Sequence, residues 1–127
     1  MTFTVEVDKG LAVADARREL AQLLDHLVDF IKRYVVVTDD ELVALSLWVL
    51  HCYCLDAFDF TPYINIWSAT KESGKTLLLQ VLALLVCKAW LTGYTTSGAL
   101  IRKIDTQQPV LLLDETDRTF AGDKDAK

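Results

Sequence analysis

The sequence contains few of the residues that interrupt helices and strands or that cross-link a fold through disulfide bonds. Its 127 residues include 2 prolines, 5 glycines and 3 cysteines, which excludes collagen-like, low-complexity and disulfide-framework proteins. The cysteines, Cys52, Cys54 and Cys87, are odd in number and lack framework spacing, so they favour a reducing compartment. Since 52% of the residues are apolar, we expect a globular chain with one core, or part of one.

A long apolar run is also missing. The two longest apolar stretches, residues 42–55 and 77–87, are interrupted by His51 and Gln80 and fall short of the roughly 20 residues that a membrane span requires. The first residues lack the basic and apolar regions of a secretory signal. We therefore expect a cytoplasmic protein that does not enter a membrane.

Basic residues are fewer than acidic ones: the sequence has 13 Lys and Arg and 18 Asp and Glu, which gives a net charge of −5. This balance excludes a protein that coats nucleic acid through bulk positive charge. A local basic groove, formed by this chain or by a neighbour, is still compatible with the composition. Nucleic acid is therefore expected only as a partner of an assembly.

Residues 1–57 form an N-terminal helical segment in this interpretation. Apolar residues recur at three- and four-residue steps over residues 11–34, which predicts a long amphipathic helix. Thr38 and Glu41 have the spacing of a capping box and predict a second helix over residues 39–54. His51 and Cys54 lie one turn apart on that helix, but a structural metal site needs about four ligands, so core packing is expected.

Residues 58–127 show strand and helix patterns in alternation, beginning at Pro62. We predict strands over residues 63–67, 90–95 and 110–113, with helices over residues 76–88 and 97–104, the latter capped by Ser97. This order predicts an α/β fold with a parallel sheet. Trp48, Trp67 and Trp90 sit in apolar patterns and are expected in the core rather than as base-stacking platforms.

A relaxed P-loop pattern lies between the predicted strand and helix. It has alanine where glycine is usual at the first position, and it comprises Ala69, Thr70, Lys71, Glu72, Ser73, Gly74, Lys75 and Thr76. Backbone N–H groups of such a loop point at a phosphate at the start of the helix. Gly74 allows the required backbone conformation, Lys75 neutralises phosphate charge, and the Thr76 hydroxyl can ligate Mg²⁺.

Two adjacent carboxylates, Asp114 and Glu115, follow the aliphatic run of residues 110–113. A buried parallel strand ends at the carboxyl edge of its sheet, where ligands of α/β folds bind. Asp114 can therefore hold Mg²⁺ opposite Thr76, and Glu115 can orient or deprotonate an attacking water. A solvated acidic turn would explain either carboxylate alone, but each motif predicts where the other should lie. Together they predict ATP and Mg²⁺ as ligands.

At these two motifs the sequence resembles P-loop NTPases of the additional-strand, catalytic-glutamate division, which contains AAA+ and RecA-like ATPases. More narrowly, residues 66–79, 99–105 and 111–115 resemble an ATPase domain of actinobacterial, phage and mobile-element proteins. Those proteins often look like replication or primase-helicase components. The resemblance implies a partial P-loop NTPase core over residues 58–127 and a hydrolase that converts ATP to ADP and phosphate.

The resemblance also implies parts that lie later in sequence: a strand between the P-loop strand and residues 110–113, a polar sensor on that strand, and an arginine finger. We therefore expect a C-terminally truncated chain, or one completed by a second copy or by a full-length ATPase partner. Arg102 and Arg118 are the finger candidates within this sequence, although surface positions are the default for both. The alternatives are a catalytically incomplete nucleotide-binding regulatory module and an inactive remnant.

Overall fold

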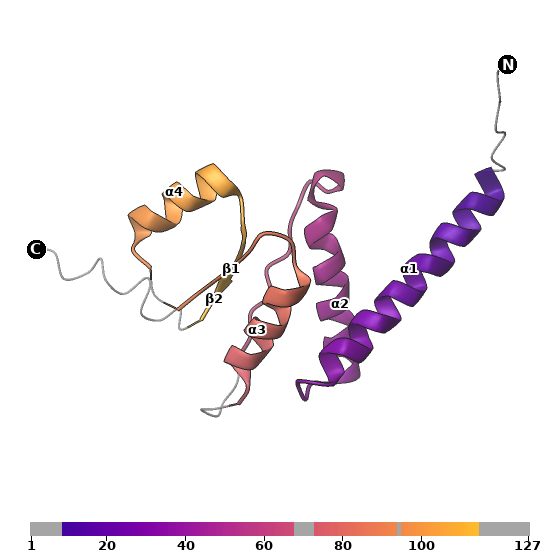
Figure 1. Ribbon diagram of the computed structural model, residues 1–127, viewed down its shortest axis with the longest axis horizontal. Helices are drawn as coiled ribbons and strands as arrows, with labels where there is room; N and C mark the ends of the chain where they lie inside the picture. Colours follow the sequence, from indigo (N-terminus) through magenta and orange to yellow (C-terminus); the bar gives the residue numbers. More distant parts are fainter. Residues whose placement is uncertain (1–8, 68–72, 94, 115–127) are drawn as a thin grey trace, which may run out of the picture.

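A computed structural model of the chain describes residues 9–67, 73–93 and 95–114 (Figure 1). Helices and strands follow one another in the order α1 (Lys9–Lys32), α2 (Asp39–Tyr53), the 3₁₀ turn η1 (Leu55–Ala57), α3 (Lys75–Leu85), β1 (Ala89–Thr92), α4 (Ser97–Gln107) and β2 (Val110–Leu113). The helices and the small parallel sheet confirm the predicted α/β class. Within the described ranges, no helix is both long and apolar enough to cross a membrane.

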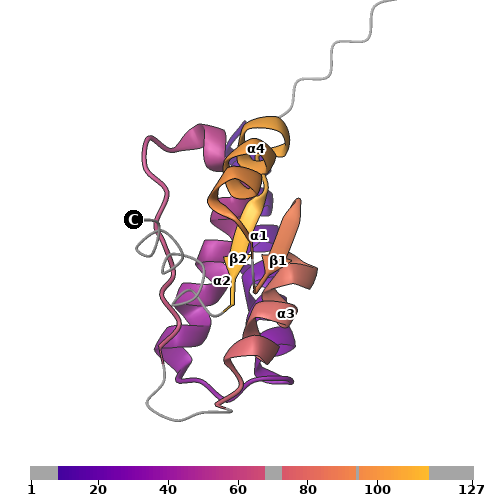
Figure 2. The same ribbon diagram turned by 90° about the vertical axis from the view of Figure 1, so that its left-hand side faces the viewer.

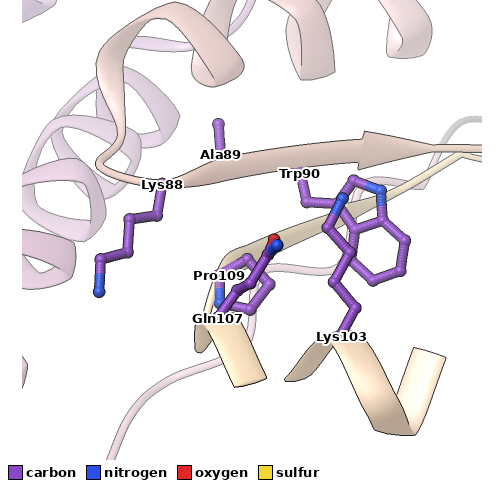
Figure 3. Close-up of a pocket in the computed structure, with 6 residues that line it drawn as sticks. All are labelled: Lys88, Ala89, Trp90, Lys103, Gln107 and Pro109. Carbon is purple, nitrogen blue, oxygen red and sulfur yellow. The ribbon is translucent and has the colours of Figure 1, made fainter. Parts of the chain in front are cut away.

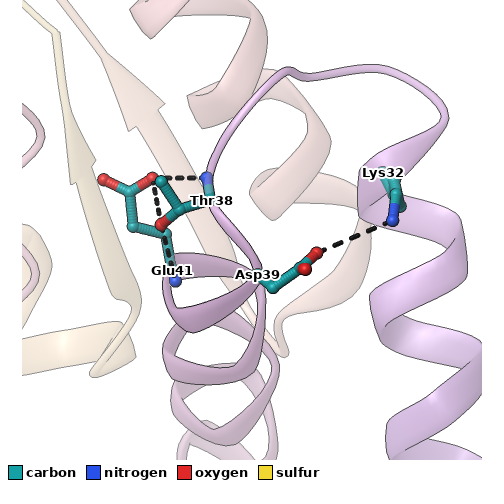
Figure 4. Close-up of polar contacts among 4 residues, drawn as sticks. All are labelled: Lys32, Thr38, Asp39 and Glu41. Carbon is teal, nitrogen blue, oxygen red and sulfur yellow. Dashed lines mark hydrogen bonds and ion pairs between the residues drawn. The ribbon is translucent and has the colours of Figure 1, made fainter.

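The predicted capping box forms at the start of α2 (Figure 4). The Thr38 backbone N–H donates to Glu41 Oε2 at 2.7 Å, and the Glu41 N–H donates to Thr38 Oγ1 at 3.3 Å. The Thr38 backbone N–H and the Thr38 hydroxyl, which donates to the same Oε2 at 2.9 Å, lower the pKa of the Glu41 carboxyl. Lys32 Nζ lies 3.6 Å from Asp39 Oδ1 and joins the end of α1 to the start of α2. Because these contacts are local, the α2 boundary was predictable from sequence.

The core lies where α1, α2, α3 and the sheet meet. Ile31 of α1 is fully buried, and Leu42 of α2 and Leu82 of α3 are each 1% exposed. Leu112 of β2 is buried in the same cluster. The N-terminal part of α1 leaves this core and projects away from the other elements, so α1 contributes to the packing mainly through its last turns (Figure 1).

The sheet consists of β1 and β2 running parallel, with Ala89 opposite Val110 and Thr92 opposite Leu113. The connection through α4 is a βαβ crossover, and α4 lies on the other side of the strands from α2 and α3 (Figures 1 and 2). Both strands therefore begin at one edge of the sheet and end at the other. The C-terminal ends, after Thr92 and Leu113, lie at the same edge.

The predicted strand at residues 63–67 is absent. Ile64 and Ile66 are half-buried against the core while their neighbours are exposed, so the side chains alternate as in a strand. A strand also needs a hydrogen-bonded partner, and the sheet of the described residues pairs only β1 with β2. The segment is instead tied to α2 by Trp48, whose Nε1–H donates to the Pro62 carbonyl at 3.1 Å.

Two further predictions are corrected. Trp67 is 80% exposed rather than in the core, whereas Trp48 and Trp90 are half-buried. The N-cap of α4 is Thr96, not Ser97: the Thr96 hydroxyl accepts from the Ala99 N–H at 3.4 Å, and Ser97 is the first helical residue. Serine and threonine are both favoured at the N-cap, so the residue types alone could not decide whether Thr96 or Ser97 precedes the helix.

Candidate nucleotide-binding site

The site is built around the start of α3. Gly74 is the N-cap of this helix and has φ 83° and ψ 10°, a left-handed conformation that a Cβ disfavours. A Cβ added at Gly74 would meet nothing within 4 Å. The glycine is therefore required by the backbone angle and not by lack of space. Its carbonyl accepts from the Leu78 N–H at 2.9 Å, which starts the helical ladder.

The N-terminus of α3 has no side-chain cap, unlike those of α2 and α4. Its first turn also contains no acidic residue and begins with the half-buried Lys75. Helix N–H groups in the first turn have no intrahelical partner, and together with the helix dipole they favour an anion. Of α2, α3 and α4, α3 is thus the helix whose N-cap residue occupies none of these groups with its own side chain, as a phosphate site requires.

The two predicted motifs meet at Thr76 and Asp114. The Thr76 hydroxyl donates to Asp114 Oδ2 at 2.7 Å, although 38 positions separate the two residues. Asp114 is half-buried at the end of β2, and its backbone N–H donates to the Thr92 carbonyl at 2.9 Å. This backbone bond continues the β1–β2 ladder and fixes the Asp114 carboxylate at the carboxyl edge of the sheet.

The side-chain oxygens of Thr76 and Asp114 suit a Mg²⁺ ion that is also bound by phosphate oxygens. Mg²⁺ prefers oxygen ligands and is usually held by one or two protein groups, waters and substrate phosphate oxygens. Thr76 Oγ1 and Asp114 Oδ2 supply one hydroxyl and one carboxylate oxygen within hydrogen-bond distance of each other. No group of three or more His, Cys, Asp or Glu side chains is poised to hold a metal in the described ranges, so an all-protein metal cage is not seen there.

Part of the predicted site lies outside the described residues: Ala69, Thr70, Lys71, Glu72 and Glu115, together with the finger candidate Arg118. Ser73, Gly74, Lys75, Thr76 and Asp114 are described, and the structure brings the last two together. Arg102 is exposed on α4, where its Nε–H donates to the Gly98 carbonyl at 3.2 Å.

Gly93 was not predicted from the sequence as part of the site. It follows β1 at the edge of the sheet where Asp114 lies. A Cβ at this position would lie 3.9 Å from the Asp114 carbonyl oxygen, an ordinary contact. Gly93 therefore lies beside the acidic motif. A glycine inside the strand predicted over residues 90–95 was the available signal, because a glycine within a strand often marks a close approach of another backbone.

The chain matches no protein-family model, no curated protein and no solved structure. The geometry described above therefore carries the functional argument.

Proposed function

We propose that this chain is an ATP-binding P-loop module whose chemistry is hydrolysis of ATP to ADP and phosphate. The observation that carries the proposal is the 2.7 Å contact between Thr76 Oγ1 and Asp114 Oδ2. It joins the start of a helix without a side-chain cap to the end of a strand that is half-buried except at the buried Leu112. A phosphate loop and an acidic strand end have to meet in this way to share one Mg·ATP.

Each residue has a distinct task in this proposal. The amide groups at the start of α3 and the Lys75 ammonium bind the β- and γ-phosphates and stabilise the charge that develops on them. Thr76 and Asp114 hold Mg²⁺, which when bound neutralises the phosphate oxygens. Glu115 follows Asp114 in sequence and accepts a proton from the attacking water, or orients that water.

The biological setting rests on the sequence resemblance. DNA replication or mobile-element functions, with a helicase-like role for the assembly, are the proposed context. A second copy of the chain or a full-length ATPase would supply the sensor and arginine finger, and nucleic acid would bind through that assembly. The proposed location is the cytoplasm.

A second candidate is a nucleotide-binding regulatory module that does not turn ATP over. The observation in its favour is that β1 is the only partner of β2 in the described part of the chain. The segment 63–67, which leads to the phosphate loop, takes no part in a ladder there. Both candidates require the same ATP site, and only turnover separates them.

The test is steady-state phosphate release from Mg·ATP by the purified chain and by Glu115→Gln, with Glu19→Gln on the exposed part of α1 as a matched charge control. Hydrolysis predicts turnover in the parent and in Glu19→Gln, and its loss in Glu115→Gln with ATP binding retained. Binding without turnover in the parent would favour the regulatory module. Equal turnover in all three proteins would remove Glu115 from the mechanism.

A further inference from the structure

A pocket of about 380 Å³ lies at the edge of the sheet where both strands begin, between the start of β1 and the C-terminal end of α4 (Figure 3). The described residues that line it are Lys88, Ala89, Trp90, Lys103, Gln107 and Pro109. Thr76 and Asp114 lie at the opposite edge, because the strands are parallel. At roughly 3.3 Å per residue the strands separate the two sites by about 10 Å.

The charge of the pocket is opposite to that of the chain. Two of its six described lining residues are lysines and none is acidic, although the net charge of the protein is −5. Neither Lys88 nor Lys103 forms an ion pair with another described residue. Two cations beside one pocket, with no ion-pair partner among the described residues, favour an anionic ligand.

Trp90 positions one of these cations. Lys103 Nζ lies 4.2 Å from the centre of the Trp90 ring, and both side chains are half-buried. Such a contact holds the ammonium group over the ring face. Figure 3 shows Trp90 and Lys103 on one side of the pocket, Lys88 on the other, and Pro109 and Gln107 between them. The apolar ring of Pro109 and the side-chain amide of Gln107 thus lie between the two lysine side chains (Figure 3).

The backbone on both sides of the pocket is held in an unusual conformation. Lys88 has φ 47° and Gln108 has φ 45°, and they are the positive-φ residues other than glycine in the described chain. The Lys88 carbonyl accepts from the Val110 N–H at 3.1 Å, which ties the two strand starts together. Left-handed non-glycine residues are disfavoured and cluster at functional sites. Here Gln108 is the C-cap of α4 and lies between the lining residues Gln107 and Pro109, and Lys88 lines the pocket itself.

We propose that this pocket binds a nucleotide unit, either free or within single-stranded nucleic acid, independently of the ATP site. Lys88 and Lys103, on opposite sides of the pocket (Figure 3), would each contact one of the two phosphates that flank the unit in a strand, and a free nucleotide would use one of them. Lys103 would leave the Trp90 ring for its phosphate, so that the base could pack against the ring and Pro109, and the Gln107 amide would hydrogen-bond to the edge of the base. A basic surface combined with an aromatic side chain is how proteins bind single strands with little sequence preference.

The test is fluorescence anisotropy of a labelled short oligothymidylate, measured without ATP or Mg²⁺. Lys88→Glu/Lys103→Glu should weaken binding at least about tenfold and reduce the slope of log K against log salt by about 1.4, the value for two phosphate contacts on a single strand. Arg17→Glu/Arg33→Glu makes the same charge change at exposed positions of the chain and should bind like the parent. Trp90→Leu should weaken binding, and Trp90→Phe should restore most of it.

Three further arms make the result decisive. Lys75→Ala should bind the oligonucleotide normally; loss of binding there, with Lys88→Glu/Lys103→Glu unaffected, would assign the nucleic acid to the phosphate loop and overturn the proposal. Competition by thymidine monophosphate would identify a free nucleotide as the ligand, and competition by the strand alone would identify the polymer. Equal competition by polyglutamate would show that the pocket recognises charge only. If the double glutamate variant fails to melt cooperatively, Lys88→Gln/Lys103→Gln replaces it.

Discussion

Thr76 and Asp114 form a hydrogen bond of 2.7 Å across the start of α3 and the end of β2. The contact depends on three separate features of the fold. Gly74 starts α3 in a left-handed conformation, β1 aligns β2, and the Asp114 backbone is bonded to Thr92. A carboxylate and a hydroxyl fixed in this way can exchange their mutual bond for a shared cation. This relationship leads directly to predictions about metal-dependent binding.

Replacing Thr76 or Asp114 should raise the Mg²⁺ concentration needed for half-maximal ATP binding. Hydrogen bonds to charged groups contribute about 1.5 kcal/mol or more, so we expect about tenfold for Thr76→Val and at least that for Asp114→Asn. Thr76→Ser keeps the hydroxyl and should behave like the parent. Titration of a fluorescent ATP analogue against Mg²⁺ measures the effect. An unchanged Mg²⁺ requirement in both Thr76→Val and Asp114→Asn would remove these residues from the metal site.

The buried face of α3 should determine stability more than its exposed face does. Leu82 is 1% exposed and Leu84, on the same helix, is 77% exposed. We expect Leu82→Ala to lower the free energy of unfolding by about 2 to 5 kcal/mol and Leu84→Ala by less than about 0.5 kcal/mol. Urea unfolding followed by circular dichroism measures both. Equal losses in the two variants would contradict the packing of α3 described above.

The capping box should make stability depend on pH through Glu41. Hydrogen bonds from the Thr38 backbone and side chain lower the pKa of this carboxyl in the folded state. The stabilisation is therefore complete above the unfolded pKa of about 4.3 and is lost as the pH falls through the folded value. The difference in Tm between the parent and Glu41→Gln should shrink as the pH is lowered through this range. Glu19→Gln is the control, and a pH-independent difference would contradict this account.

Cys52 and Cys54 should differ in reactivity towards alkylating reagents. Burial, followed by the nearby Cys87, raises the pKa of the Cys52 thiol to about 11, while Cys54 is exposed. Since the thiolate is the reactive form, Cys52 should react at least about a hundredfold more slowly than an ordinary thiol near pH 8. Iodoacetamide labelling followed by peptide mass spectrometry compares the two sites. Denaturation in urea should equalise them; equal rates in the native chain would contradict the burial of Cys52.

Local signals in the sequence were sufficient for the helices. The Thr38–Glu41 capping box and the apolar periodicity of residues 11–34 predicted α2 and α1 because their contacts span only a few residues. The β-forming residues of the segment 63–67 predicted a strand, but they could not supply a partner strand. Trp67 shows the same limit, since an apolar side chain does not reveal whether another element covers it.

The site was partly predictable because two motifs constrained each other. Neither Thr76 nor Asp114 is informative alone, but a phosphate loop and an acidic strand end imply proximity, and the two side chains do lie in contact. The pocket of Lys88, Trp90 and Lys103 had no such signal. Its residues come from two elements, and they converge only after the βαβ crossover has placed α4 over the strand starts. Tertiary packing creates this pocket, so sequence spacing could not predict it.

The most direct test of the central claim is the thermal midpoint of the purified chain with and without Mg·ATP. A ligand at about 100 times its Kd adds about 2.7 kcal/mol to the folded state, which for a domain of this size is a shift of roughly 5 to 15 °C. Lys75→Ala should lose the shift, and Arg17→Ala, which removes a charge from the exposed part of α1, should keep it. A cooperatively melting parent whose Tm does not change with Mg·ATP would contradict the proposed nucleotide site.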